Sequence, residues 1–101
     1  MLDRKLLGGL VHLHILHHAC HEPIFGVGIM EELARHGYKL SPGTLYPILH
    51  GLEKTGYLIS SEQMVEGRIR RTYVATEAGM SALVFAKTRV RELYQELFEE
   101  E

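Results

Sequence analysis

Three arginines stand close together in the second half of the chain, shortly after a segment rich in small and hydrogen-bonding residues. A guanidinium group is always charged and carries several N–H donors, which suits it to phosphate oxygens. The preceding segment carries hydroxyl, imidazole and ammonium groups, which can bind phosphates or base edges. The residues expected to contact a nucleic acid are Ser41, Thr44, Tyr46, Pro47, His50, Lys54, Arg68, Arg70 and Arg71.

A second group of chemically active side chains is a set of histidines near the start of the chain. His14, His18 and His21 are spaced i, i+4 and i+7, with Cys20 beside them. This spacing places imidazoles on one helix face, as zinc and other nitrogen-ligand metals require. No carboxylate has a matching spacing and one cysteine cannot form a thiolate site, so the sequence assigns no metal ligand and no cofactor. Metal sensing and a pH-sensitive interface remain alternatives for this cluster.

The sequence does not predict an enzyme. The serines have no nucleophile-elbow setting, and no glycine pattern of a phosphate-binding or dinucleotide-binding loop is present. Cys20 lies near His17 and His21, as a nucleophile lies near its base. A leucine-rich helix is a poor electropositive pocket for a thiolate, so we expect Cys20 to be inert.

The polar segment is predicted to form a short helix from Ser41 to about Thr55. Ser41 is expected to accept a hydrogen bond from a free N–H group of the first turn, and Pro42 suits the first helical position. Gly56 allows a left-handed stop at the C-terminal end. One side of the helix is apolar and is expected to be buried, through Leu45, Leu49 and Leu52.

Further elements are expected on both sides of this helix. Two earlier helices are expected at 3–21 and 27–36. Two strands are expected at 57–63 and 68–75, joined by a turn at 64–67. A final helix is expected at 77–101, with Thr76 as its N-cap. A helix with a small-residue face beside an arginine-bearing hairpin is the layout of a winged helix, in which the helix enters the DNA major groove and the wing touches phosphates. The expected fold class is mainly α with a small β-hairpin (α+β).

Several short motifs follow one another along the chain: Pro23–Gly26, Thr44–Leu49, Leu52–Glu53, Gly56–Leu58, Arg70–Tyr73 and Thr76–Gly79. Their order and spacing resemble the PadR family of bacterial transcriptional regulators over nearly the whole chain. The resemblance implies a winged helix-turn-helix domain in residues 1–76 and a dimerisation helix in residues 77–101. It also implies double-stranded DNA as a partner and a small aromatic effector bound in the dimer cavity.

The final helix carries an apolar seam whose members recur at alternating steps of three and four residues, as in a coiled coil. Two packings are open: the seam folds back on the first helix, or it also packs on a partner subunit. The seam spacing favours a two-fold dimer, which would engage both half-sites of a palindromic operator. The expected interface residues are Leu83, Ala86, Val90, Leu93, Tyr94 and Leu97.

Length and charge distribution agree with a small DNA-binding domain. The 101 residues are 46% apolar, enough for one small core. The net charge is only −2, but residues 35–76 hold six basic and three acidic side chains, whereas residues 77–101 hold three basic and six acidic ones. Positive charge is thus concentrated where DNA contact is expected. The lack of a recognisable signal or membrane span, together with a single cysteine, leads us to expect a cytoplasmic location.

The favoured hypothesis is a sequence-specific, homodimeric transcriptional regulator. A repressor released by a small-molecule effector is expected rather than an activator, because no segment resembles an activation surface. The rival hypothesis is a protein-interaction module, or a metal or pH sensor, on a winged-helix scaffold.

Overall fold

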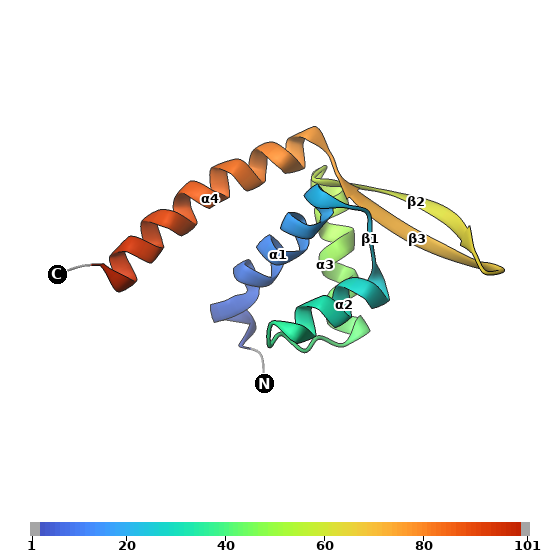
Figure 1. Cartoon of the computed structure of the whole chain (residues 1–101), viewed down its shortest axis with the longest axis horizontal. Coiled ribbons are helices and arrows are strands. Elements are labelled where there is room, and N and C mark those ends of the chain that lie inside the picture. Colours follow the sequence, from blue (N-terminus) through green and yellow to red (C-terminus); the bar gives the residue numbers. More distant parts are fainter. Residues whose placement is uncertain (1–2, 100–101) are drawn as a thin grey trace.

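The computed structural model describes residues 3–99. The elements in chain order are α1 (Arg4–His21), β1 (Ile24–Phe25), α2 (Gly26–Arg35), α3 (Pro42–Thr55), β2 (Leu58–Val65), β3 (Arg68–Ala75) and α4 (Glu77–Phe98). Helices α1, α2 and α3 pack together, the β2–β3 hairpin projects to one side of them, and α4 extends to the other side (Figure 1). The expected α+β fold class is confirmed.

Helix α4 begins at the expected cap Thr76, and α1 is capped by Asp3, which had been expected inside the helix. The Asp3 carboxylate accepts hydrogen bonds from the main-chain N–H groups of Lys5 (3.1 Å) and Leu6 (3.2 Å). At α4, the Thr76 hydroxyl oxygen accepts the N–H of Gly79 at 3.0 Å. Such a bond satisfies one of the donors that a helix leaves free in its first turn.

Helix α3 begins at Pro42 with Ser41 as its N-cap, but the expected side-chain cap was wrong. The Ser41 hydroxyl accepts no hydrogen bond from the first turn and instead donates to the Thr44 hydroxyl (3.4 Å). The Ser41 carbonyl already accepts the Thr44 N–H (3.0 Å), so the donor that the hydroxyl would have satisfied is occupied. At the other end, Gly56 has φ 97° and provides the predicted left-handed stop.

The sheet contains a strand that the sequence did not predict. Its order is β1-β3-β2 with antiparallel neighbours, and β1 pairs Ile24 with Tyr73. A two-residue strand is too short to show alternation, so no periodic signal marks β1. The β2–β3 turn is also tighter than expected, because Met64 and Val65 continue β2. Glu66 and Gly67, with φ 51° and 80°, form the two-residue turn that suits the twist of a hairpin.

The core lies between the three N-terminal helices and the sheet. The three N-terminal helices and the sheet each contribute buried apolar side chains, and Tyr73 of β3 is buried among them. The largest fully buried side chains are Val11, Ile15, Leu33, Leu45, Leu49, Leu58 and Tyr73.

The start of α4 is fixed to the connection between α3 and β2. The Thr76 N–H donates to the Tyr57 carbonyl (3.0 Å), and the Thr76 hydroxyl donates to the Gly56 carbonyl. A methyl group at Gly79 would lie 3.1 Å from the Tyr57 carbonyl carbon and closer still to its oxygen. Glycine at this position therefore allows the helix to approach the main chain directly.

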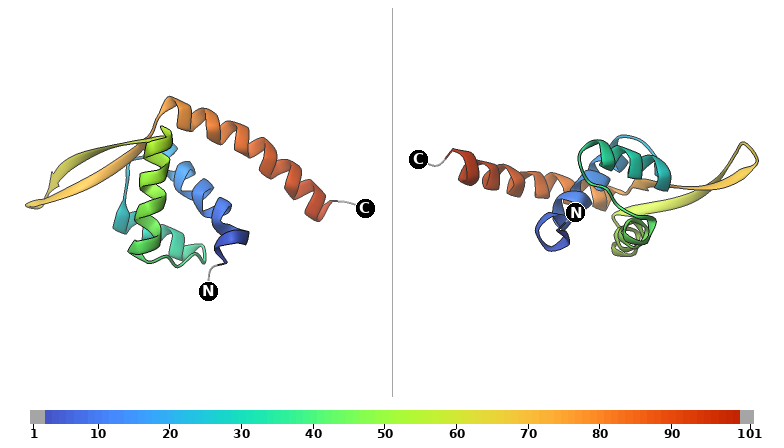
Figure 2. Two further views of the ribbon diagram at one scale, coloured as in Figure 1. Left: turned by 180° about the vertical axis from the view of Figure 1, so that it is seen from behind. Right: turned by 90° about the horizontal axis from the view of Figure 1, so that it is seen from below.

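Beyond its first turns, α4 leaves the core. Leu83 packs partly against the core, whereas Val90, Leu93 and Leu97 are 44%, 51% and 60% exposed. Figure 2 shows α4 continuing past α1, away from the hairpin. The fold-back on α1, one of the two packings left open, therefore covers only the first part of the seam. None of the helices within residues 3–99 is long and apolar enough to cross a membrane.

Candidate nucleic-acid interface

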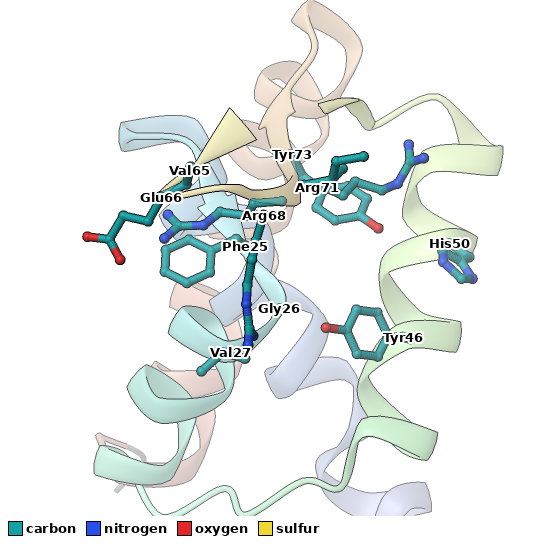
Figure 3. A pocket seen from close by; sticks show the side chains of 12 residues that line it. Phe25, Gly26, Val27, Tyr46, His50, Val65, Glu66, Arg68, Arg71 and Tyr73 are labelled. Carbon is teal, nitrogen blue, oxygen red and sulfur yellow. The ribbon is translucent and has the colours of Figure 1, made fainter. Parts of the chain in front are cut away.

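A groove runs between the β2–β3 hairpin, the start of α2 and the side of α3 that faces the hairpin (Figure 3). Two of the predicted residues on α3 and all three arginines of β3 line it. The structure thus brings together side chains from positions 46 to 71, namely Tyr46, His50, Arg68, Arg70 and Arg71.

Arg70 is positioned by an aromatic ring. Its guanidinium carbon lies 3.9 Å from the centre of the Phe25 ring, within the range of a cation–π contact. The ring packs in turn over Gly28, where a methyl group would lie 2.8 Å from the Phe25 Cζ atom. Arg70 is consequently half-buried and held at the groove by the start of α2.

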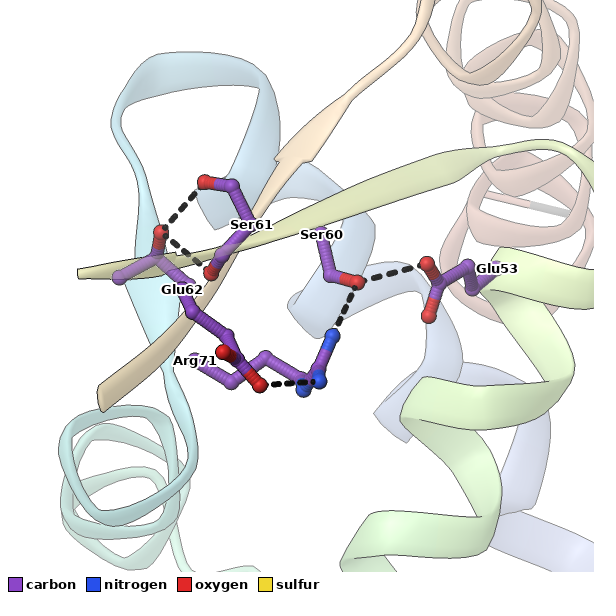
Figure 4. Close-up of polar contacts among 6 residues, drawn as sticks. Glu53, Ser60, Ser61, Glu62 and Arg71 are labelled. Carbon is purple, nitrogen blue, oxygen red and sulfur yellow. Dashed lines mark hydrogen bonds and ion pairs between the residues drawn. The ribbon is translucent and has the colours of Figure 1, made fainter. Parts of the chain in front are cut away.

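Arg71 belongs to a polar network at the base of the wing (Figure 4). Its guanidinium donates to the Glu62 carboxylate (2.8 Å) and to the Ser60 hydroxyl (3.0 Å). Ser60 donates in turn to the Glu53 carboxylate of α3 (2.7 Å). Arg71 therefore braces the hairpin against α3, and Glu62 offsets part of its charge. Arg68 is exposed and forms no ion pair within residues 3–99.

Tyr46 is held against the first residue of α2. Figure 3 shows its hydroxyl pointing across the groove toward Gly26. A methyl group at Gly26 would lie 2.6 Å from the Tyr46 Cζ atom. The Tyr46 ring stays 36% exposed, and its centre lies 6.3 Å from that of the His50 ring. Gly26 thus allows the Tyr46 ring to fit between the two helices of the helix-turn-helix.

The other predicted residues lie outside this groove. Thr44 and Pro47 line a separate depression with Gly8 and Leu40, toward the start of α1. Ser41 and Lys54 are exposed near the two ends of α3. The expected site therefore divides into a wing-side groove and the outer surface of α3.

Phe25 and Gly26 are site residues that the sequence analysis did not assign. Both lie in the Pro23–Gly26 motif, so this motif was the sequence feature that could have identified them. The role of Phe25 depends on its pairing with Thr72, which brings β1 beside β3, and that of Gly26 depends on the packing of α2 against α3. Because these contacts join different elements of the chain, spacing along one element could not reveal them.

Cys20 is a free, partly buried cysteine. Burial raises the pKa of its thiol, which favours the unreactive protonated form.

The α2–α3 pair followed by the β2–β3 wing defines a winged helix-turn-helix protein, a class that places its second helix in the DNA major groove. Residues 15–84 match the model of the transcriptional regulator PadR-like family. The chain therefore belongs to the PadR-like family of transcriptional regulators. Members of this family bind DNA and are not enzymes.

Individual relatives agree with this assignment. The transcriptional regulator Rv3488 of Mycobacterium tuberculosis is 48% identical over 94 residues, covering 93% of this chain and 88% of the relative. A PadR family transcriptional regulator from Eggerthella lenta has a TM-score of 0.83 at 26% identity, covering 94% of this chain and 84% of the other. The smu.1704 protein of Streptococcus mutans has a TM-score of 0.77 at 30% identity, covering 85% and 80%.

Proposed function

We propose that this chain is a sequence-specific repressor that binds a palindromic operator in the cytoplasm as a homodimer. The observation that carries the proposal is the convergence of Tyr46 and His50 of α3 with Arg68 and Arg70 of the wing at one groove. Repression needs only occupancy of a promoter, so it requires no surface beyond the DNA-binding and dimer surfaces.

In this proposal the exposed side of α3 enters the major groove. That side carries the small residues Gly43, Pro47 and Gly51, so the helix can approach base edges closely. Arg68, exposed near the hairpin turn, would contact phosphates or the minor groove. Arg70 would contact the backbone from its fixed position on Phe25, while Arg71 holds the wing at its angle to α3.

The exposed apolar surface of α4 supports the homodimer. Val90, Leu93 and Leu97 face solvent, as do Leu6 and Leu10 of α1. Exposed apolar side chains that recur along a helix are typical of a protein–protein interface, and a two-fold axis would cover them with the same residues of a second chain. A small aromatic effector bound between the subunits would change the separation of the two α3 helices and so release the operator.

The DNA proposal is tested by selecting bound sequences from random duplex DNA and measuring the affinity of variants for the selected site. Tyr46→Ala is expected to weaken operator binding by about 1–3 kcal/mol with little effect on random DNA. Arg68→Ala is expected to weaken binding to the operator and to random DNA alike, and to reduce the salt dependence of the affinity. Arg89→Ala, which removes an exposed α4 arginine outside the groove, is the control. If Tyr46→Ala and Arg68→Ala bind the selected site with the affinity of the wild type, the proposed interface is refuted.

The dimer is tested separately by Val90→Asp. A carboxylate buried without a partner at the centre of the seam is expected to cost association about 3–5 kcal/mol. The variant should sediment as a monomer at micromolar concentration and fail to shift a palindromic site. Thr88→Asp, on the opposite side of α4, is the matched control. A monomeric wild type would refute the proposed dimer, and the operator should then be a single half-site.

A further inference from the structure

Three imidazoles meet where α1 packs against the C-terminal end of α2. His14 and His18 lie on successive turns of α1, and His36 directly follows α2. One ring nitrogen from each lies within 4.8 Å of the other two. Tetrahedral zinc with Zn–N bonds of about 2.0–2.1 Å holds its ligand atoms roughly 3.3 Å apart. Small side-chain rotations are therefore enough to bring the three nitrogens to one ion.

A carboxylate lies at the same place. The Glu32 Oε2 atom is 3.2 Å from His36 Nε2 and 3.8 Å from His18 Nε2. Its other oxygen pairs with Arg35 at 3.3 Å, which fixes the direction of the carboxylate. Glu32 comes from α2, so histidine spacing within α1 alone could not indicate it. The cluster thus offers three nitrogen donors and one oxygen donor.

The surroundings of the cluster suit metal binding. A metal ligand must be the neutral imidazole, and burial, followed by the nearby His36 and His18, lowers the pKa of His14. Three protonated rings at this separation would repel one another, whereas an ion would bind all three. A pocket lined by His18, Glu32 and Pro23 adjoins the cluster and gives an ion an entry path.

We propose that His14, His18, His36 and Glu32 form a binding site for a divalent transition-metal ion, zinc in particular. The donor set fits a four-coordinate zinc site, whereas magnesium and calcium require mostly oxygen ligands. His21, which shares the helix spacing of His14 and His18, is not a member. Its Nδ1 atom lies 2.8 Å from the His17 carbonyl oxygen, and its ring packs against that of His17, with 4.5 Å between the ring centres.

The proposed site joins α1 to α2, the first helix of the helix-turn-helix. Bound zinc would therefore hold α2 on α1 and raise the stability of the folded chain. This proposal is independent of DNA binding, because neither helix needs an operator to form the site.

Zinc binding to the metal-free full chain can be measured by competition with a chromogenic chelator. One ion per chain is expected, and His36→Ala, which removes a direct ligand, should lower its affinity by more than the roughly 10–100-fold that loss of an outer-shell partner costs. His36 is exposed, so this variant should fold; His14→Gln is a second variant from the other helix. His21→Ala is the matched control and should bind as wild type. Cobalt should show the intense visible absorption of a tetrahedral site, and magnesium should not compete.

Thermal unfolding provides an independent readout. Zinc should raise the Tm of the wild type and of His21→Ala, but not that of His36→Ala. The proposal is overturned if wild type and His36→Ala bind zinc equally, if His21→Ala loses binding instead, or if the cobalt spectrum is octahedral.

Discussion

Replacing Gly79 by alanine tests how α4 is attached to the winged-helix core. The added methyl group would lie 3.1 Å and 3.3 Å from the Tyr57 carbonyl carbon and Cα, and closer still to the carbonyl oxygen. These are main-chain atoms, so no side-chain rotation relieves the contact. The Tyr57 carbonyl also accepts the Thr76 N–H at 3.0 Å, so displacing it strains the hydrogen bond that precedes α4.

The magnitude follows from these two contributions. Overpacking by one methyl group costs about 1–3 kcal/mol, and a strained or lost hydrogen bond adds about 1 kcal/mol. We therefore expect Gly79→Ala to lower the free energy of unfolding by about 2–4 kcal/mol. For a domain of this size, this corresponds to a Tm lower by at least about 8 °C.

Thermal unfolding followed by circular dichroism at one protein concentration measures this effect. Gly51→Ala is the matched control, because Gly51 is also helical and no neighbouring atom lies within 4 Å of the added methyl group. Alanine there should raise the stability by about 0.5–1 kcal/mol through its better helix propensity. Equal Tm values for Gly79→Ala and wild type would show that the close approach to Tyr57 does not determine how α4 is attached.

Three further predictions concern the groove, the wing and the thiol. Gly26→Ala should displace the Tyr46 ring and weaken operator binding. The losses of Gly26→Ala and Tyr46→Ala should be non-additive in a double-mutant cycle. Additive losses would show that the two residues act independently on DNA binding. Gly67→Ala should cost about 1–2 kcal/mol in urea unfolding, because its φ of 80° is left-handed; an unchanged midpoint would contradict this. Because burial raises the pKa of the Cys20 thiol, a thiol reagent at pH 8 should modify the folded chain more slowly than the urea-unfolded chain; equal rates would place the thiol in solvent.

The sequence predicted the features that depend on neighbouring residues. The ends of α1 and α3 follow from Pro23 and Gly56, and the wing follows from alternating residues around a glycine turn. The apolar periodicity of α3 identified its buried side because leucines three and four positions apart share one face of a helix.

The features that were missed depend on contacts between elements. The ring of Phe25 lies beneath Arg70 because β1 is beside β3, and Gly26 contacts Tyr46 because the start of α2 packs against α3. His36 joins His14 because α2 crosses α1 at that point. The Ser41 cap failed for a local reason, since a main-chain carbonyl competes with the hydroxyl for the same donor.

The short strand β1 has a consequence for the order of folding. Its pairing of Ile24 with Tyr73 closes a loop of about 50 residues, an entropic cost that the local β2–β3 hairpin does not carry. The hairpin can therefore form before β1 joins it, whereas the position of Phe25 beside Arg70 requires the β1–β3 pairing. The groove beside Phe25 is thus completed late, and a chain still being synthesised presents no finished surface to DNA.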